Sequence, residues 1–412
     1  PNQFIDRDPD LFSVLLSLLR TGSLPSKAKA FDLDDLIAES RFYGVEHLLV
    51  AALSDPSLLE GFNLERSMRL PLTGRDSPSA ISATRFGTVH VSHGSKITSF
   101  DWSLRRKRTV ITEFPAVDSL LAISPSFAAV GATDFSGLQV VDLEEGFVRE
   151  RLVWENVTRS GSTVQAIGAS QELLFSSFES GRRNSSCIVA YDKESFLPVA
   201  EIGHSEIFGA DLWAGIPAGK LEWVDSYGFL MAAGSHGGPS GFLGNVKLFD
   251  IRSGKAVWEL KEVVDCFSDI TVSNSLSAIV KVGVNSGEVF YADFRKLEGG
   301  EEYTPWVSLG EKRRSVAGAK KEGLKCKIAA HGSQVYVSRG GDIELWSEVM
   351  MGNSSKREGG LPERVFRKNV MGRATDMGGS RITNLGFGGN KMFVTRSDQQ
   401  SVEVWQSPVK GF

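Results

Sequence analysis

The sequence predicts a mainly β protein, in which a seven-bladed β-propeller follows a short helical region. Three features lead to this prediction: a strand-like apolar run that recurs along most of the chain, turn residues between these runs, and helical spacing of apolar residues in the first sixty positions. The recurring run ends in an aromatic or aliphatic residue that Asp usually follows. It occurs at 97–101, 138–142, 188–192, 246–250, 289–293, 343–347 and 402–406.

The spacing of these runs indicates the type of β fold. Their ends lie 41, 50, 58, 43, 54 and 59 positions apart. A period near about 45 residues that contains strand-like runs alone is typical of propeller blades. Residues 69–412 give about 49 positions to each of seven blades. Six or eight blades are open alternatives.

Length, composition and charge are ordinary for a globular protein of two domains. The 412 residues are 41% hydrophobic and 23% charged, and the net charge of −4 gives no electrostatic reason to expect binding to nucleic acid or membrane. No apolar run reaches the about 18 residues of a membrane-spanning helix. The three cysteines, Cys187, Cys266 and Cys326, are odd in number and widely spaced. They favour reduced thiols and an intracellular location, cytoplasmic or nuclear.

The N-terminal region predicts three short helices. The first begins at Pro9 with Asp8 as its N-cap and ends at Gly22, because apolar residues recur at helical spacing between them. The second runs over Asp32–Phe42 and the third over Val45–Leu53. Helices this short bury too little apolar surface to be stable alone, so we expect them to pack on a sheet or on a partner.

The helical region also carries a motif. Residues 4–9 read Phe-Ile-Asp-Arg-Asp-Pro, Leu-Arg-Thr-Gly follows at 19–22, and Phe-Tyr-Gly at 42–44. In sequence and spacing this stretch resembles the C-terminal half of a BTB/POZ domain of the potassium-channel tetramerisation (KCTD) type. Domains of that family begin with an Asn-Val-Gly-Gly strand and hairpin, so we expect further residues before Pro1. The expected organisation is a BTB/POZ part at 1–53, a connector at 54–66 and the propeller at 67–412.

The resemblance implies a surface for self-association and partner binding in the BTB part. Arg7 offers a planar fork of donors that suits carboxylates or carbonyl groups across a subunit boundary. Asp8 favours the positive end of the helix that follows it. A local cap beside a solvated arginine is the alternative interpretation. The interface candidates are Asp6, Arg7, Asp8, Phe12, Phe42 and Tyr43.

Each propeller unit is expected to consist of strands separated by turn residues. The second unit predicts strands at 120–123, 127–131, 137–141 and 148–154; the fourth predicts them at 221–224, 229–233, 246–249 and 256–260. The seventh unit lacks a fourth strand before the chain ends. We expect residues 67–72 to supply that strand, because closing the ring would remove an exposed sheet edge.

The units resemble WD repeats, but loosely. Trp346 and Trp405 stand where that family has its Trp, whereas the Gly-His pair of the family is mostly missing and has Gly203-His204 as its best candidate. The prediction of a propeller is therefore stronger than that of WD repeats.

No motif for catalysis, metal binding or cofactor binding stands out. The six histidines form no HxxxH, HExxH or His–Cys cluster, and His90 and His93 need not face one another in a strand. The glycine-rich stretch 234–241 lies between strands, where a hairpin loop is expected instead of a phosphate-binding loop. We therefore expect no catalytic residue, no metal and no cofactor.

Two basic stretches fall in longer connections of the fifth and sixth units, at 312–327 and 356–368. They are either solvated loops or a rim that recruits an acidic partner peptide or a phosphosite. Nucleic acid fits them less well, because aromatic residues do not alternate with the basic ones. The candidates for partner binding on the propeller are Arg313, Arg314, Lys320, Lys321 and Arg357.

The BTB resemblance implies a function. BTB proteins with a second interaction domain are often substrate-specific adaptors of cullin-3 ubiquitin ligases, in which the BTB part forms homo-oligomers and binds cullin-3 while the other domain binds the protein substrate. A recruited conjugating enzyme supplies the chemistry, so the chain itself is not expected to be an enzyme. One alternative is a non-catalytic oligomeric scaffold without a ligase role. Another is an enzyme with its site in the propeller channel, which inward-facing carboxylates or histidines at a channel mouth would indicate.

Overall fold

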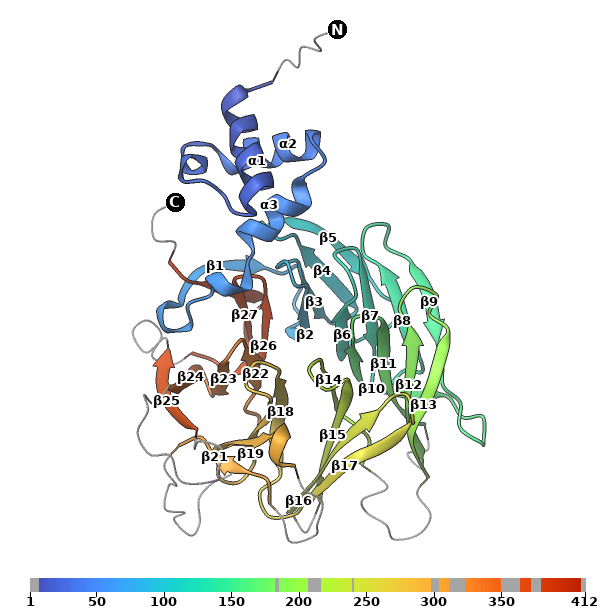
Figure 1. Cartoon of the computed structure of the whole chain (residues 1–412). Helices are drawn as coiled ribbons and strands as arrows, with labels where there is room; N and C mark the ends of the chain where they lie inside the picture. Colours follow the sequence, from blue (N-terminus) through green and yellow to red (C-terminus); the bar gives the residue numbers. More distant parts are fainter. Residues whose placement is uncertain are drawn as a thin grey trace.

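A computed structural model describes residues 7–181, 185–206, 216–238, 241–297, 304–310, 323–349, 364–371 and 379–408. In these residues the chain forms seven four-stranded β-sheets arranged as a ring, with three α-helices stacked over one face of that ring (Figure 1). The predicted mainly β fold and the number of seven blades are therefore confirmed.

The helices follow the local rules that predicted them. They are α1 (Pro9–Thr21), α2 (Leu33–Phe42) and α3 (Glu46–Leu53). The Asp8 side chain accepts hydrogen bonds from two backbone N–H groups of the first turn of α1, and Asp32 accepts one at the start of α2. These bonds satisfy N–H groups that have no partner within the helix. Short 3-10 helices lie at Ser26–Ala30, Pro56–Leu58, Gly61–Asn63 and Phe294–Lys296.

The three helices share one apolar core, and the propeller completes it. The buried members of this core are Leu11, Val14, Leu15, Leu18, Ala28, Leu36, Ile37 and Leu49. Trp102, from a turn of the first blade, packs against them. The expected packing partner of the helices is thus the propeller of the same chain.

The blades are antiparallel sheets, most of them built from consecutive strands. The first three are β2–β5 (Pro78–Ala83, Val89–His93, Lys96–Phe100, Arg106–Ile111), β6–β9 (Ser119–Ala122, Phe127–Gly131, Leu138–Asp142, Val148–Leu152) and β10–β13 (Ser162–Ala169, Leu173–Ser180, Ser185–Asp192, Pro198–Glu206). The fourth and fifth are β14–β17 (Lys220–Val224, Phe229–Gly238, Gly241–Asp250, Lys255–Glu262) and β18–β21 (Phe267–Ser273, Ala278–Gly283, Val289–Asp293, Val307–Ser308).

The sixth blade consists of β22–β25 (Ile328–His331, Gln334–Arg339, Asp342–Val349, Val365–Met371). In the seventh blade β26 (Ile382–Gly388), β27 (Lys391–Arg396) and β28 (Ser401–Gln406) are joined by the N-terminal strand β1 (Glu65–Pro71). The first strand of each blade contacts the first strands of the neighbouring blades, so these strands surround the centre of the ring.

The ring is closed by the N-terminal strand, as the sequence predicts. Strand β1 pairs antiparallel with β28, from Glu65 opposite Gln406 to Pro71 opposite Ser401. The pairing gives the seventh blade its fourth strand and covers an edge that would otherwise expose unpaired backbone groups. In Figure 1 the first and last strands of the propeller accordingly lie together, beneath the helices.

In the glycine-rich stretch, residues 234–238 and 241 belong to the paired strands β15 and β16 and not to a loop. The β15–β16 ladder continues to Gly238 opposite Gly241. Glycine is needed at Gly234, where a Cβ atom would lie 2.2 Å from the carbonyl oxygen of Pro217. The prediction of a hairpin is confirmed, and its strands extend further than predicted.

Candidate interaction surfaces

Four of the six predicted interface residues of the BTB part gather into one cluster. The ring centroids of Phe12 and Tyr43 lie 5.2 Å apart, and those of Phe42 and Tyr43 lie 5.0 Å apart. The Arg7 guanidinium carbon lies 4.0 Å from the centroid of the Phe42 ring. Phe12 is 41% exposed and Phe42 54% exposed. We call Arg7, Phe12, Phe42 and Tyr43 the aromatic surface.

Local sequence explains how this cluster forms. Phe12 lies in the first turn of α1, directly after the Asp8 cap, whereas Phe42 ends α2 and Tyr43 follows it. The packing of α1 against α2 therefore brings the two chain segments together. Of the two remaining interface candidates, Asp8 uses its side chain to cap α1, and Asp6 lies outside the described residues.

A buried carboxylate positions Arg7 on the aromatic surface. Glu39, in α2, is 4% exposed, and its Oε2 atom lies 3.6 Å from Nη1 of Arg7. Its other oxygen has no hydrogen-bond partner in the described part of the chain. The ion pair keeps the guanidinium over the Phe42 ring, where it gains a cation–π contact. Tyrosine and arginine, both present in this cluster, are enriched among the residues that contribute most to protein–protein binding.

Contacts between the helices and the propeller hold the aromatic surface in place. The Asn390 side chain donates a 3.1 Å hydrogen bond to the backbone carbonyl of Leu53, at the end of α3. Arg105 forms an ion pair with Asp34 of α2. Both propeller residues lie in turns on the face that carries the helices.

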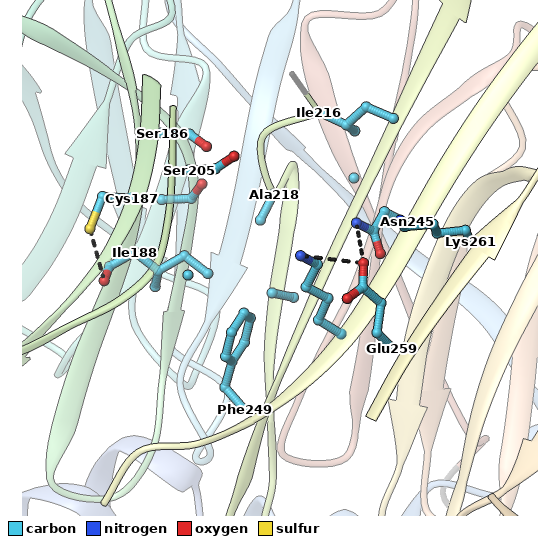
Figure 2. Close-up of a pocket in the computed structure, with 15 residues that line it drawn as sticks. Ser186, Cys187, Ile188, Ser205, Ile216, Ala218, Asn245, Phe249, Glu259 and Lys261 are labelled. Atoms are coloured by element: carbon cyan, nitrogen blue, oxygen red, sulfur yellow. Dashed lines mark hydrogen bonds and ion pairs between the residues drawn. The ribbon is translucent and has the colours of Figure 1, made fainter. Parts of the chain in front are cut away.

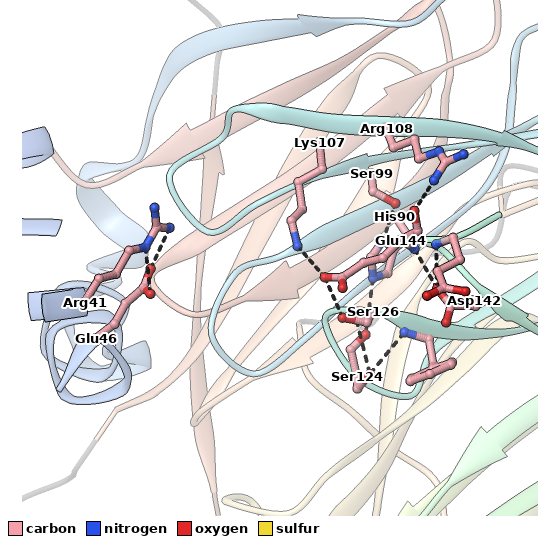
Figure 3. A network of polar contacts seen from close by, with 12 residues as sticks. Arg41, Glu46, His90, Ser99, Lys107, Arg108, Ser124, Ser126, Asp142 and Glu144 are labelled. Carbon is pink, nitrogen blue, oxygen red and sulfur yellow. Dashed lines mark hydrogen bonds and ion pairs between the residues drawn. The ribbon is translucent and has the colours of Figure 1, made fainter. Parts of the chain in front are cut away.

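Polar contacts stiffen this side of the molecule (Figure 3). Arg41 and Glu46 form a two-pronged ion pair within the helical region, with both distances 2.9 Å. On the propeller, Lys107 of the first blade lies 3.0 Å from Glu144 of the second. Hydrogen bonds from Ser126 and Lys107 lower the pKa of the Glu144 carboxyl. These exposed pairs link neighbouring segments and provide no reactive group.

The two histidines of β3 serve the core and not a metal. His90 is fully buried; its Nδ1 atom lies 2.9 Å from Oγ of Ser99, and burial lowers its pKa to about 4. His93 bonds separately to Thr98, with 2.8 Å between Nε2 and Oγ1. Within the described ranges, no group of three or more His, Cys, Asp or Glu side chains could hold a metal ion.

A charged cluster that the sequence reasoning missed lies at the centre of the ring. The Lys220 ammonium lies 3.3 Å from Glu222 and 3.6 Å from Asp269. Burial lowers the pKa of Lys220, but the two carboxylates outweigh burial and raise it. Glu222 also accepts a 2.6 Å hydrogen bond from the Val272 N–H, and Asp269 accepts one from the Ile328 N–H.

This cluster joins the inner strands of three blades, because its carboxylates on β14 and β18 bond to β18 and β22. It borders a channel cavity of about 580 Å³ between the first strands of blades one to five. The channel therefore does contain carboxylates, but Glu222 and Asp269 are engaged in joining strands. The local signal was weak: charged residues alternate with apolar ones in a strand, which is also the pattern of an ordinary exposed face.

A second polar cavity, of about 290 Å³, lies between the third and fourth blades (Figure 2). On its fourth-blade side, the Asn245 amide donates to Glu259 over 3.3 Å, and Lys247 lies 3.4 Å from the same carboxylate. On its third-blade side lies Cys187, whose thiol has its pKa raised to about 12 by burial. A thiol that stays protonated is a poor nucleophile.

The structure also describes the three cysteines and shows which of the predicted propeller candidates it leaves undescribed. Cys187, Cys266 and Cys326 are free and buried. None of the helices in the described residues has the length and apolar character needed to cross a membrane. The predicted propeller candidates Arg313, Arg314, Lys320, Lys321 and Arg357 all lie outside the described residues.

The fold and the aromatic surface together define a protein with two interaction modules, a BTB part and a β-propeller. Family models match both: "BTB/POZ domain" over residues 2–53, and "At2g24240-like, C-terminal beta propeller" over residues 73–407. The chain belongs to the family of BTB/POZ proteins with an At2g24240-like C-terminal propeller.

Three relatives from Arabidopsis thaliana span both modules. The chain is 59% identical to the BTB/POZ domain-containing protein At5g41330, over 99% of this chain and 89% of the relative. It is 24% identical to At4g30940 and to At2g24240, over 98% of this chain and 88% and 87% of those proteins. Among solved structures, the β-propeller domain of Cps50 (Swd1) from Myceliophteria thermophila is similar. It has a TM-score of 0.55 and 11% identity, covering 84% of this chain and all of that one, which shows the fold alone.

Proposed function

We propose that this protein is a substrate-specific adaptor of a cullin-3 ubiquitin ligase. The BTB part binds cullin-3 and a second copy of the chain, and the propeller binds a protein substrate. The protein acts inside the cell, in the cytoplasm or nucleus, and has no catalytic site of its own. Its two modules are of kinds that typically serve protein interaction and not catalysis.

The observation that carries this proposal is the placement of the aromatic surface. It is an exposed cluster on helices that are anchored to one face of the propeller through Trp102, Asn390 and Arg105. In the described part of the chain, the three α-helices all lie on this one face (Figure 1). A BTB part that is anchored to one face of the propeller leaves other propeller surfaces for a second partner, which suits a protein that brings two partners together.

Gel filtration with light scattering tests the proposal. The full-length protein is mixed with the N-terminal domain of cullin-3, and the mass of the complex is measured. We expect a stoichiometric complex at micromolar concentration and a defined oligomer. Oligomers that do not bind cullin-3 would support the alternative of a non-catalytic scaffold. A monomer that ignores cullin-3 would reject both.

A substitution locates the interface. We expect Phe42→Ala to weaken cullin-3 binding or self-association by about tenfold or more, because it removes the ring between Arg7 and Tyr43. The matched control is Phe147→Ala, which removes a ring of similar exposure, 49%, from the propeller. Equal effects of the two substitutions, or none from Phe42→Ala, would contradict an interface at the aromatic surface.

A further inference from the structure

A basic pocket lies on the propeller face opposite the helices. It has a volume of about 340 Å³, and its lining includes Lys325, Lys327 and Arg381. Strand β26 shows that the pocket and the helices lie on opposite faces. It begins beside Arg381 and crosses the propeller to Gly388, two residues before Asn390, which bonds to α3. We call Lys325, Lys327 and Arg381 the basic pocket.

The residues of the basic pocket come from the entries to two blades. Lys325 and Lys327 precede β22, and Arg381 immediately precedes β26. Lys325 has a φ of 66°, in the left-handed region that a lysine seldom adopts. Lys325 and Arg381 are exposed, and Lys327 is half-buried. Three long cationic side chains thus line one pocket, although they come from two segments over fifty residues apart in the sequence.

The cations of the basic pocket differ from two buried cations of the propeller, which have carboxylate partners. Lys281 is paired with Glu262 at 2.7 Å, and Arg396 with Glu403 at 3.0 Å. In contrast, the side chains of the basic pocket form no hydrogen bond or ion pair within the described ranges, and no Asp or Glu is among the described residues that line it. Three cations that share a space, with no acidic side chain in its described lining, favour the binding of an anion.

The shape and lining of the basic pocket favour a peptide over other anions. The cations are spread over two blades, so a chain with several carboxylates can contact more of them than one small anion can. Leu324, 44% exposed, lies beside them and offers apolar contact to a side chain. A nucleic acid would need exposed rings for base stacking, but of the two rings in the described lining Phe267 is 4% exposed and Phe242 is half-buried.

We propose that the basic pocket binds an acidic segment of a protein partner, whose carboxylates pair with Lys325, Lys327 and Arg381. The proposal rests on the proposed function where it assigns the propeller to substrate binding, and it adds the chemical class of that substrate. It also extends the expectation of a basic rim, since Arg381 lies in neither of the two basic stretches of the sequence.

Fluorescence anisotropy tests the proposal with the full-length protein. One labelled probe is a short peptide rich in Asp and Glu with interspersed Leu, and the other is its analogue with Asn and Gln. We expect the acidic peptide to bind at least about tenfold more tightly than the analogue, and to weaken as salt is added. No binding, or equal binding of the two peptides, would overturn the proposal. Tighter binding of a single-stranded oligonucleotide would also overturn it and indicate a nucleic-acid site.

Two double variants separate the pocket from general charge effects. Lys325→Glu with Arg381→Glu is expected to lower the affinity for the acidic peptide by about tenfold or more. The control, Lys255→Glu with Arg367→Glu, makes the same charge change on exposed residues of β17 and β25 and should cost less than about twofold. If both double variants lose the same affinity for the acidic peptide, the peptide is held by the general charge of the protein, and the pocket proposal is rejected. Thermal unfolding of both variants checks that they are folded.

Cullin-3 binding by the same variants distinguishes the two proposals. Protein that binds cullin-3 but not the acidic peptide would reject the basic pocket and leave the adaptor proposal standing. Protein that binds the peptide through the basic pocket but does not bind cullin-3 would reject the adaptor proposal and support the basic pocket. If the pocket variant no longer binds the acidic peptide but still binds cullin-3, the result would support both proposals.

Discussion

Glu39 is the residue on which the geometry of the aromatic surface depends. Its carboxylate is almost fully buried beneath Arg7, and one of its oxygens has no hydrogen-bond partner in the described part of the chain. Burying a carboxylate is unfavourable unless a cation or donors compensate it. The Arg7 guanidinium compensates the charge at the Oε2 atom of this carboxylate. The same ion pair holds the guanidinium over the Phe42 ring.

His90 is a second buried group at which structure and protonation are coupled. Its pKa is lowered to about 4 by burial, from an ordinary value of 6.5 in the unfolded chain. Between these two values the unfolded state binds more protons than the folded state. The free energy of unfolding must therefore fall as the pH is lowered from 6.5 to about 4. The stability that comes from keeping this imidazole neutral is fully present above pH 6.5.

We expect the substitution His90→Gln to remove this dependence. Between about pH 7.5 and about pH 5 the native protein should lose about 2 kcal/mol more unfolding free energy than the variant, because glutamine does not titrate. Urea unfolding at the two pH values measures this difference. His47→Gln, at an exposed position, is the control. A pH dependence unchanged by His90→Gln would show that the buried imidazole is not responsible.

Residue-scale features could be predicted where their partners are close in sequence. Asp8 can be identified as a helix cap from the sequence, because a cap bonds two or three residues ahead. The Lys220 cluster could not be found in this way, because Asp269 lies almost fifty positions away and belongs to another blade. Arg381 of the basic pocket was missed for the same reason.

At the scale of elements, Glu403 ties the closing strand to its blade. This residue of β28 is 1% exposed, and its carboxylate lies 3.0 Å from Arg396 of β27 and 3.4 Å from Arg66 of β1. The Trp405 indole N–H donates to it over 3.3 Å. One buried carboxylate thus connects three strands of the blade in which the two ends of the propeller meet.

We expect Glu403→Ala to lower the free energy of unfolding by about 3–5 kcal/mol, because it leaves the buried Arg396 without a counter-charge. Glu403→Gln should cost less, since it keeps an acceptor oxygen. Urea unfolding measures both changes. Glu144→Ala removes an exposed carboxylate that also has a lysine partner and should cost less than about 1 kcal/mol. Similar losses for Glu403→Ala and Glu144→Ala would contradict a special role for the buried pair.

The closing strand could be predicted because the seventh unit lacked a fourth strand, and 67–72 was the remaining strand-like stretch. Its pairing with β28 spans about 330 positions, yet ring closure leaves few other edges to pair. Strand lengths were less predictable. The ladder of β15 and β16 extends through glycines that, in sequence alone, indicate a loop.

At the scale of the whole molecule, the propeller separates two surfaces of different chemistry. The aromatic surface lies with the helices on one face, and the basic pocket opens on the other. The sequence predicted the two modules, but not the face on which the helices pack, because that depends on contacts such as Asn390 with Leu53. The arrangement allows both surfaces to be occupied at once.

The side chain of Trp102 should decide whether the helices stay docked. Trp102 is half-buried against the apolar core of the helices. In the described residues before β1 there is no β-strand that could cover this core instead. We expect Trp102→Ala to raise amide hydrogen exchange in α1–α3 by about tenfold or more, because helices of this length are not stable alone.

Exchange in the blades should change little, since their ladders and inter-blade cores do not include Trp102. The control is Trp258→Ala, which removes a half-buried indole from β17 and should affect the fourth blade but not the helices. Faster exchange throughout the propeller after Trp102→Ala would mean that the two modules unfold together. Unchanged exchange in α1–α3 would mean that Asn390 and Arg105 suffice to hold them, and that the aromatic surface does not depend on the apolar contact.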